Sequence, residues 1–433
     1  MEKHSAPKVA VSIFYNVGSH DEPDGQKGIN ELISTAILQG TEKYPSDLRQ
    51  KMRDEYSASY GDRNGQDITF MWTEIQKEQL EFVLDLESDR MVNINIDAEM
   101  LSTIKDRYKT DWDEYNKDDL QIAFATAIST IMPDGHPYKI DLMGIPEQVD
   151  TLSLATCQKW YKNYYSPNNA VLVIVGDITP LELSTLVYIY FGNIKAADEL
   201  PIDIDLTLEY INPQTSDVSN YKLQANPSWF RLYGSLTTPL FFMPSARDDD
   251  AIVLDHLHNI LRLDANKRGK IFKRMSKNRR LIANTEINFF PLLGYSGFSI
   301  IGMNILRKGS ERKINKRILS TFEYLGKNGV GGKLLDEYKK SELLRSYEND
   351  YSYKNIANSL GYAELIMGDY HFYNRKRTLL KELTNEDIKR VAKKYFNKSN
   401  MQTVTIILNK KNWFTPIASF FANQILFRFW DPQ

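Results

Sequence analysis

Four side chains near the start of the chain could do chemistry together: Glu31, Ser34, Thr35 and Asp111. The first three fall within residues 11–41, in the part of this segment that we expect to be helical. Positions 31 and 35 lie one helical turn apart, so their side chains share a face. Oxygen ligands in this arrangement would suit a hard cation such as Mg²⁺ or Ca²⁺, whereas a threonine hydroxyl is a poor ligand for zinc. Ser34 cannot act as a general base at neutral pH without an activating partner.

Two interpretations of the Glu31 and Asp111 carboxylates remain open. Charged residues usually lie at the surface, which favours a pair of partly solvated helix carboxylates. The alternative is that both bind a hard cation through their oxygen atoms. The sequence contains no further cluster of oxygen ligands that would complete such a site, so it assigns no metal to this chain.

The sequence around these residues predicts a strand, a turn and a helix. An apolar run at residues 11–15 predicts the strand. The turn that follows contains Gly18, Ser19 and Glu22, and a Gly-Thr step at 40–41 ends the helix. The helix would therefore hold its three polar positions in fixed register behind a short strand.

This strand, turn and helix resemble the N-terminal signature of the pitrilysin/insulinase-type zinc metallopeptidases, the inverzincins. The matching frame consists of Gly18, Ser19, Glu22, Gly28, Gly40 and Thr41. In that family the helix carries His-x-x-Glu-His, in which the histidines share one zinc ion and the glutamate takes a proton from the zinc-bound water. The corresponding positions here hold Glu31, Ser34 and Thr35, and the position of the family's third ligand, a glutamate, holds Asp111. The resemblance therefore implies a pseudopeptidase, with degenerate positions in place of the catalytic residues and zinc ligands.

Further segments resemble the family over nearly the whole chain. They are LDLESDRM (84–91), a His-Pro-Tyr segment (134–153), LVIVGDITP (172–180), YFGNI (190–194) and a helical stretch (367–396). Because these segments extend into both halves of the chain, the resemblance implies the complete family fold.

An internal repeat supports the same fold independently of the lost motif. Residues 152–175 and 383–406 each contain a helix that ends in an aromatic pair, then an asparagine-containing turn and a β-branched strand. Ser153 and Thr384 stand at the helix N-cap positions. The repeat predicts an α+β protein with two similar duplicated domains, each a mostly antiparallel sheet with helices on one face.

The resemblance and the repeat together predict the domain limits. We expect an N-terminal peptidase-like domain at 1–205, a linker at 206–220, a C-terminal peptidase-like domain at 221–410 and a tail at 411–433. Family members usually carry one more strand before the segment that corresponds to His4, so we expect the first strand to be missing.

The tail contains a predicted amphipathic helix. Thr415 and Pro416 form its cap and first turn, and apolar residues then recur on one face as far as Phe429. This helix is too short and too polar to span a bilayer. Two roles remain open: packing on its own domain or a partner subunit, or lying in a membrane interface.

Composition excludes some function classes. The chain has 433 residues, a net charge of −2 and a single cysteine, Cys157. A near-neutral charge gives no strong attraction to nucleic acid or anionic membranes, and one cysteine excludes an intrachain disulfide. The compartment stays unknown, although a periplasmic or cell-envelope location is expected if the protein is bacterial and its N-terminus is truncated.

Candidate binding residues in the second half of the chain are also degenerate. The family often supplies an Arg and a Tyr there that grip substrate, and by register these positions fall at Ser276 and Ala283. The nearby basic run, which includes Arg274, is either a solvated helix end or a basic wall that faces peptide carboxylates. His256 and His258 would point about 200° apart on a helix, so we expect structural roles for them rather than a shared metal.

The resemblance also implies how the protein works. Family members of this size pair two chains around a peptide chamber, and one chain of a pair is often zinc-free. We therefore expect a non-catalytic subunit that binds a catalytic pitrilysin-type homologue as a hetero-oligomer, with zinc only in that partner. Unfolded peptide would bind by strand addition to a sheet edge, and no nucleic acid is expected. Two alternatives stay open: a scaffold subunit of a larger complex, such as a membrane complex, or a metal-dependent peptidase that uses Glu31 and Asp111.

Overall fold

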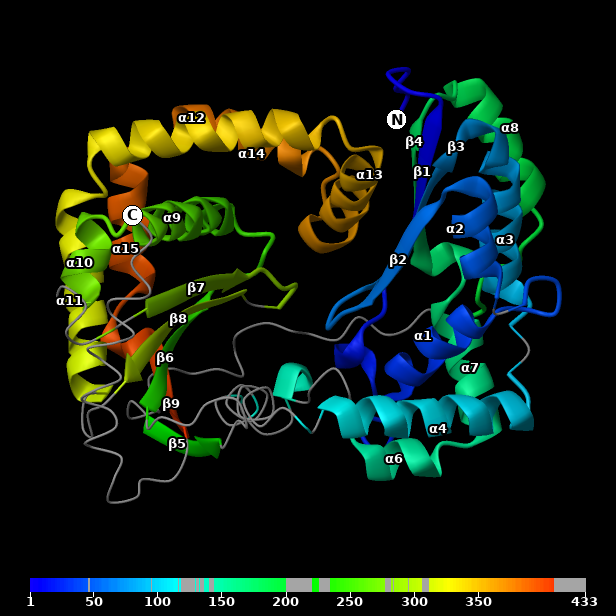
Figure 1. Ribbon diagram of the computed structural model, residues 1–433, viewed down its shortest axis with the longest axis horizontal. Helices are drawn as coiled ribbons and strands as arrows, with labels where there is room; N and C mark the ends of the chain where they lie inside the picture. Colours follow the sequence, from blue (N-terminus) through cyan, green and yellow to red (C-terminus); the bar gives the residue numbers. More distant parts are fainter. Residues whose placement is uncertain are drawn as a thin grey trace. The chain divides into compact units, whose positions relative to one another are not determined.

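The chain is represented by a computed structural model that contains both helices and strands (Figure 1). The described residues are 1–45, 47–94, 96–115, 117, 129, 132, 136–139, 144–199, 220–225, 234–276, 282, 284–294, 296–305 and 311–408. These residues form two compact units. Unit 1 draws on 1–113, 140–205 and 344–377, and unit 2 on 114–139, 206–343 and 378–433.

The first half of the chain contributes four strands and most of the helices of unit 1. In chain order they are β1 (Lys8–Tyr15), α1 (Ile29–Gln39), α2 (Leu48–Tyr56), β2 (Ser59–Asn64), β3 (Thr69–Gln76), α3 (Leu80–Val92), α4 (Ala98–Tyr115), α6 (Pro146–Thr151), α7 (Leu154–Tyr164), β4 (Ala170–Gly176) and α8 (Pro180–Phe191). The strands form one sheet in the order β2-β3-β1-β4, and every neighbouring pair in it is antiparallel.

One face of this sheet packs against helices from the same part of the chain. Ile13 and Met71 belong to a buried cluster that includes residues of α1, α4 and α7. Val9, Val11 and Ile75 belong to a second cluster with residues of α2, α3 and α8. Alternate residues of each strand therefore point into an apolar layer, which fixes the position of α1 above the sheet.

The other face of the same sheet is covered by α13 (Tyr353–Tyr362), a helix from far along the chain. Tyr353 and Ala357 pack against Ala10 and Val175 in a buried cluster. Gly361 permits the close approach, because a Cβ atom there would overlap the ring of Phe14. Residues 344–377, which the sequence pattern placed in the second domain with helices on one face only, thus complete unit 1. The physical reason is that both faces of β1 are apolar and need cover.

The second half of the chain supplies unit 2. Its strands are β5 (Asn220–Ala225), β6 (Gly234–Met243), β7 (Asn284–Phe290), β8 (Ser296–Ile305) and β9 (Met401–Leu408). The remaining helices of this half are α9 (Asp249–Asn266), α10 (Lys270–Ser276), α11 (Glu311–Asn328), α12 (Gly332–Asn349), a π-helical turn (Ala363–Met367), α14 (Phe372–Glu382) and α15 (Asn385–Tyr395). The sheet order is β5-β9-β6-β8-β7, antiparallel except for the parallel β5–β9 pair.

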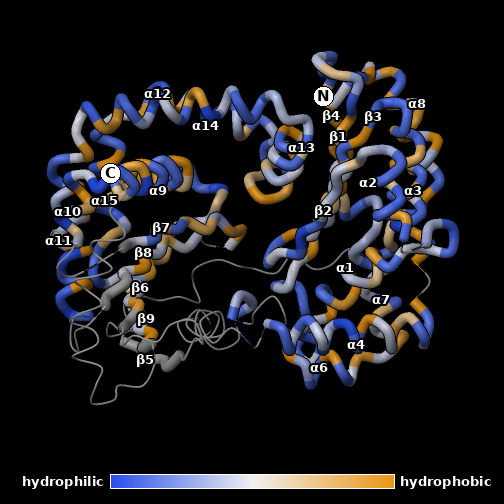
Figure 2. The backbone as a smooth tube through the Cα atoms, in the orientation of Figure 1, coloured by the Kyte–Doolittle hydropathy of each residue, from blue (hydrophilic) through white to orange (hydrophobic). Residues whose placement is uncertain are grey.

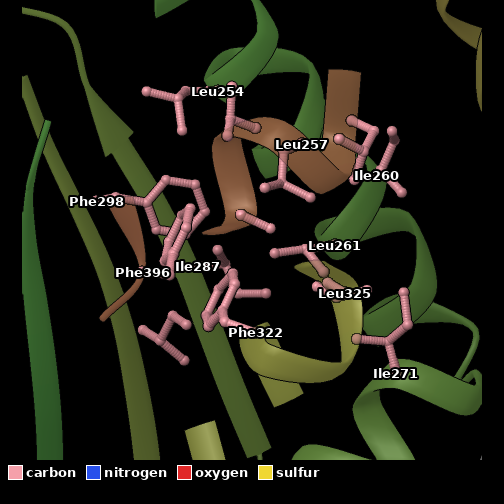
Figure 3. Packing of buried hydrophobic residues seen from close by; sticks show 14 of the residues in the cluster. Leu254, Leu257, Ile260, Leu261, Ile271, Ile287, Phe298, Phe322, Leu325 and Phe396 are labelled. Carbon is pink, nitrogen blue, oxygen red and sulfur yellow. The ribbon is translucent and has the colours of Figure 1, made fainter. Parts of the chain in front are cut away.

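An aromatic cluster forms the core of unit 2 (Figure 3). The rings of Phe322 and Phe396 stack with their centroids 3.7 Å apart, and Phe298 lies edge-on to Phe396 at 4.9 Å. These side chains come from α11, β8 and the end of α15, so the cluster packs α11 and α15 against the sheet. Hydrophobic and hydrophilic residues alternate along α4, as expected for a helix with one solvent-facing side (Figure 2).

The predicted repeat is visible in both units. Helix α7, a 3-10 turn (Pro167–Asn169) and β4 correspond to α15, a 3-10 turn (Lys398–Asn400) and β9. Ser153 and Thr384 cap the two helices, each accepting a hydrogen bond from a backbone N–H three residues on. The order β2-β3-β1-β4 also matches β7-β8-β6-β9. The predicted α+β class with two similar units is therefore confirmed.

Two predicted segments fall outside the part of the chain that the structure describes. These segments are the linker residues 206–219 and the tail at 411–433, and β5 begins at Asn220. Among the helices that the structure describes, none combines the length and the apolar character needed to cross a membrane.

Candidate functional site

The candidate site is built on α1, whose first turn is held by a buried carboxylate. Glu22 accepts hydrogen bonds from the backbone N–H groups of Gly28 (2.8 Å) and Asn30 (2.9 Å). The helix would otherwise leave these donors without partners. Burial raises the pKa of Glu22 to about 8, against the opposing effect of these hydrogen bonds. Gly28 itself has φ 103°, a left-handed conformation that favours glycine.

A second glycine, Gly144, packs against the same turn at the start of α1. Gly144 also has a positive φ of 76°, and a Cβ atom there would overlap the backbone of Gly28. The backbone N–H of Ile145 donates to the carbonyl of Lys27 at 3.2 Å. The start of α1 is thus held between the turn at Glu22 and the chain at Gly144.

Glu31 lies in the first turn of α1 and points towards strand β2. Its carboxylate accepts a hydrogen bond of 2.7 Å from the side-chain amide of Asn64. Burial raises the pKa of Glu31, and the nearby Asp111 and Asp62 carboxylates raise it further, while Asn64 and Arg107 oppose the shift. Asp111 therefore lies close enough to Glu31 for their charges to interact across α1 and α4.

Asp111 on α4 and Asp62 on β2 each have a cationic partner within the chain. Asp111 is exposed and pairs with Arg107, one turn earlier on α4, at 3.6 Å. Asp62 pairs with Arg49 at 2.9 Å. These contacts occupy the carboxylates with guanidinium groups, which have no acceptor lone pairs and cannot bind a metal ion.

The two hydroxyl positions on α1 offer no catalytic group. Ser34 is buried, and its hydroxyl donates to the backbone carbonyl of Glu31 at 3.0 Å. Thr35 is half-buried on the next position. No group of three or more histidine, cysteine, aspartate or glutamate side chains with metal-binding geometry occurs among the described residues. The residues at this site therefore do not fit zinc, which requires nitrogen, sulfur or carboxylate ligands around an open position.

The sequence did not predict a buried polar network that lies beside Glu31. Asn30 donates from its side-chain amide to Asn64 and to Thr69, and its carbonyl oxygen accepts from the hydroxyl of Tyr165. Asn30 is fully buried, so these bonds satisfy groups that would otherwise be costly to bury. They tie α1 to β2, β3 and the end of α7. No spacing signal marks such a network, because its members are distant in the sequence.

Comparison with known families decides what this site belongs to. The family model for Insulinase (Peptidase family M16) matches residues 1–144, and the model for the Peptidase M16 inactive domain matches residues 151–342. The chain belongs to the M16 (insulinase) peptidase family. The two models together match residues of both units of this M16 protein, as far as residue 342.

Relatives of this M16 protein include proteases and a subunit of a respiratory complex. The zinc protease PqqE of Helicobacter pylori is 21% identical over 402 residues, covering 92% of this chain and 87% of that protein. The mitochondrial cytochrome b-c1 complex subunit 1 of Caenorhabditis elegans is 21% identical over 194 residues, which is 45% of this chain and 41% of that protein. The crystal structure of a protease from Helicobacter pylori superposes with a TM-score of 0.79 at 18% identity, covering 94% and 95% of the two chains.

The remaining candidate residues of this M16 protein lie in unit 2. Ser276 is fully buried at the end of α10, and Ala283 is outside the described residues. His256 and His258 are buried on α9, where His256 Nδ1 contacts the Tyr338 hydroxyl at 2.7 Å and His258 Nε2 donates to the carbonyl of Ile287 at 2.9 Å. Each histidine thus has a separate structural contact.

Proposed function

We propose that this M16 protein is a non-catalytic subunit that pairs with a zinc-bearing homologue and completes a peptide-binding chamber. The observation that carries the proposal is the internal satisfaction of the degenerate site. Ser34 bonds its own helix backbone, Glu31 is held by the Asn64 amide, and Asp111 is paired with Arg107. These contacts within the chain support a site that does not activate water.

The same region keeps the architecture of a functional peptidase domain. The buried Glu22 carboxylate and the contact of Gly144 with Gly28 hold α1 as firmly as an active site would need. Retention of this scaffold without its chemistry supports a role in shaping a chamber wall. The partner would then supply zinc, the general base and the cleavage step.

Peptide capture would use the free edge of the sheet in unit 1. Strand β2 is an edge strand of that sheet among the described residues, and it pairs with β3 on one side only. An extended peptide can pair with such an edge through backbone hydrogen bonds, while alternate side chains contact the surface on each face. Because Asn64 ends β2 and bonds Glu31, this edge runs directly beside the degenerate site.

Co-expression with an M16 homologue that carries intact His-x-x-Glu-His tests the proposal. We expect a stable hetero-oligomer, zinc at about one ion per pair, and cleavage of unfolded peptides that needs both chains. The matched control is a partner in which the glutamate of that motif is replaced by glutamine, which should abolish cleavage but keep the complex. Zinc binding and peptide cleavage by the present chain alone would overturn the proposal, as would failure to form any complex with such a homologue.

A scaffold role in a larger complex is the second candidate. The similarity to cytochrome b-c1 complex subunit 1 favours it, because that protein is a component of a multisubunit assembly. Purification of the full chain from its source cell separates the two candidates. Co-purification of an M16 homologue with an intact zinc motif supports the peptidase partner, whereas co-purification of a membrane complex without peptidase activity supports the scaffold.

The third candidate, a peptidase with an atypical metal, requires Glu31 and Asp111 to share a cation. Elemental analysis of the purified chain decides it. We expect no stoichiometric metal, because both carboxylates already have partners within the chain.

A further inference from the structure

The free edge of β2 presents different charges at its two ends. Tyr60 lies opposite Thr73 and Asn64 lies opposite Thr69 in the antiparallel register with β3. Both threonines are buried beneath the helices, so Tyr60 and Asn64 point to the same face of the sheet. Any peptide strand added beside β2 would send alternate side chains towards this face.

The end of the edge at Tyr60 is basic. The guanidinium group of Arg49 lies 4.7 Å from the centre of the Tyr60 ring, and that of Arg53 lies 5.4 Å from it. Arg53 also donates to the Tyr60 hydroxyl at 2.8 Å. Arg49 is neutralised by Asp62, but the exposed Arg53 has no acidic partner among the described residues. One uncompensated positive charge is therefore held in place by an aromatic ring.

The end of the edge at Asn64 is acidic. The Asn64 amide donates a hydrogen bond to the Glu31 carboxylate, and this neutral partner adds no positive charge. Within the part of the chain that the structure describes, Glu31 forms no ion pair, because Arg107 is paired with Asp111. Glu31 is only half-buried, so its side chain keeps contact with solvent.

The two charges match one register of an added strand. Tyr60 and Asn64 are four residues apart, which corresponds to about 13 Å along a strand at roughly 3.3 Å per residue. Residues four apart on an added peptide also share one face. We propose, resting on the peptide-binding function above, that the peptide taken up at β2 carries a basic and an acidic side chain four residues apart, facing Glu31 and Arg53 respectively.

The direction of the peptide follows from the sheet. The pairs β1–β3, β1–β4 and β2–β3 are all antiparallel, and a peptide that continues this pattern runs opposite to β2. Its earlier residue then lies beside Asn64 and its later residue beside Tyr60. The preferred order is therefore Lys or Arg first and Asp or Glu four residues later.

Fluorescence anisotropy with labelled peptides tests this on the full chain. The probes are unstructured twelve-residue peptides with one background sequence, carrying Lys-x-x-x-Glu, the reversed Glu-x-x-x-Lys, or Gln at both positions. We expect the Lys-x-x-x-Glu peptide to bind about five-fold tighter than the reversed peptide, since exposed pairs contribute up to about 1 kcal/mol each. Equal affinity for the two charged orders, or preference for the reversed one, overturns the charge assignment while peptide binding stands. Absence of binding by all three peptides instead overturns the proposed function.

Charge-changing variants locate the effect on the protein. Arg53→Glu should abolish the preference for a glutamate at the later position, and Glu31→Gln should abolish the preference for a lysine at the earlier one. Lys51→Glu is the matched control, because Lys51 is an exposed cation about 200° around α2 from Arg53. If Lys51→Glu removes the preference as strongly as Arg53→Glu does, the recognition is long-range attraction and the assignment to the β2 edge is wrong.

Discussion

The side-chain amide of Asn64 donates a hydrogen bond of 2.7 Å to the carboxylate of Glu31. This bond joins the edge strand β2 to the helix α1, on which the family resemblance predicts the degenerate metal-ligand position Glu31. It gives one oxygen of the Glu31 carboxylate a donor within the protein. The relationship leads directly to a prediction about the stability of the chain.

Replacement of Glu31 by Gln is expected to stabilise the protein at neutral pH. Burial raises the pKa of Glu31, so the folded chain holds this proton more tightly than the unfolded chain. The stability that the carboxyl contributes is therefore present below its unfolded pKa and is lost as pH rises through the folded value. Urea unfolding of Glu31→Gln should show a gain of up to about 1 kcal/mol at pH 7 that disappears at pH 4.

The effect of Glu31→Gln on stability shows whether the Glu31 carboxylate binds a metal ion. A carboxylate that bound a structural cation would give the opposite result, with Glu31→Gln less stable than the wild type and EDTA lowering the melting temperature of the wild type alone. Glu99→Gln, an exposed position on α4, is the control and should leave the unfolding free energy unchanged.

The buried Glu22 carboxyl predicts a stronger pH dependence. Because burial raises the pKa of Glu22 to about 8, its contribution to stability is complete below the unfolded value of 4.5 and is lost as pH rises to about 8. Each unit of this shift corresponds to about 1.4 kcal/mol, so the expected loss is on the order of a few kcal/mol. The difference in unfolding free energy between Glu22→Gln and wild type should therefore grow across this window. Parallel curves for the two proteins would contradict the prediction.

The sequence predicted those parts of the fold that depend on local patterns. Ser153 and Thr384 marked two helix starts because a hydroxyl that caps a helix acts within three residues. The strand, turn and helix between residues 11 and 41 were predicted from the resemblance of the frame from Gly18 to Thr41 to a family signature. The sequence also singled out Glu31 and Asp111, and the structure brings their charges close enough to interact.

Long-range packing could not be predicted in the same way. The helix α13 covers β1 through contacts such as the 2.7 Å hydrogen bond from the Ser12 hydroxyl to Asn358. Nothing in the amphipathic pattern of residues 353–362 names the surface that they cover. The network around Asn30 escaped prediction because its partners come from strands and a helix that are brought together only by folding.

Asp250 is predicted to stabilise unit 2 through its buried charge. Burial alone would raise its pKa, but Lys394, Arg390 and Tyr395 donate to the carboxylate and lower its pKa to about 2. Asp250→Asn should reduce the free energy of unfolding by about 1–3 kcal/mol at pH 7, because three donors lose a charged acceptor. The difference from wild type is expected to persist above the unfolded pKa of 3.8 and to shrink as pH falls towards 2.

The neighbouring Asp249 provides the control for this measurement. It is exposed in the same helical turn, so Asp249→Asn should change the unfolding free energy by less than about 0.5 kcal/mol. Equal effects of the two substitutions would show that the helix dipole, rather than the contacts of Asp250, accounts for the stabilisation.

The contact of Gly361 with Phe14 predicts that unit 1 depends on a helix from the second half of the chain. A Cβ atom at Gly361 would overlap the Phe14 ring, which is fully buried and stacked on Phe70 with centroids 4.6 Å apart. Gly361→Ala should therefore destabilise the protein by about 1–3 kcal/mol, even though alanine is the better helix former by about 1 kcal/mol.

Gly332→Ala isolates the steric effect in this last experiment. A Cβ atom at Gly332, the first residue of α12, would meet no atom within 4 Å. That variant should be as stable as the wild type or slightly more stable, because it keeps the helix gain without the overlap. Thermal unfolding of both variants, followed by tryptophan fluorescence, gives the comparison. A Gly361→Ala protein as stable as Gly332→Ala would mean that α13 does not pack on Phe14 in solution, and the cover of β1 would have to come from elsewhere.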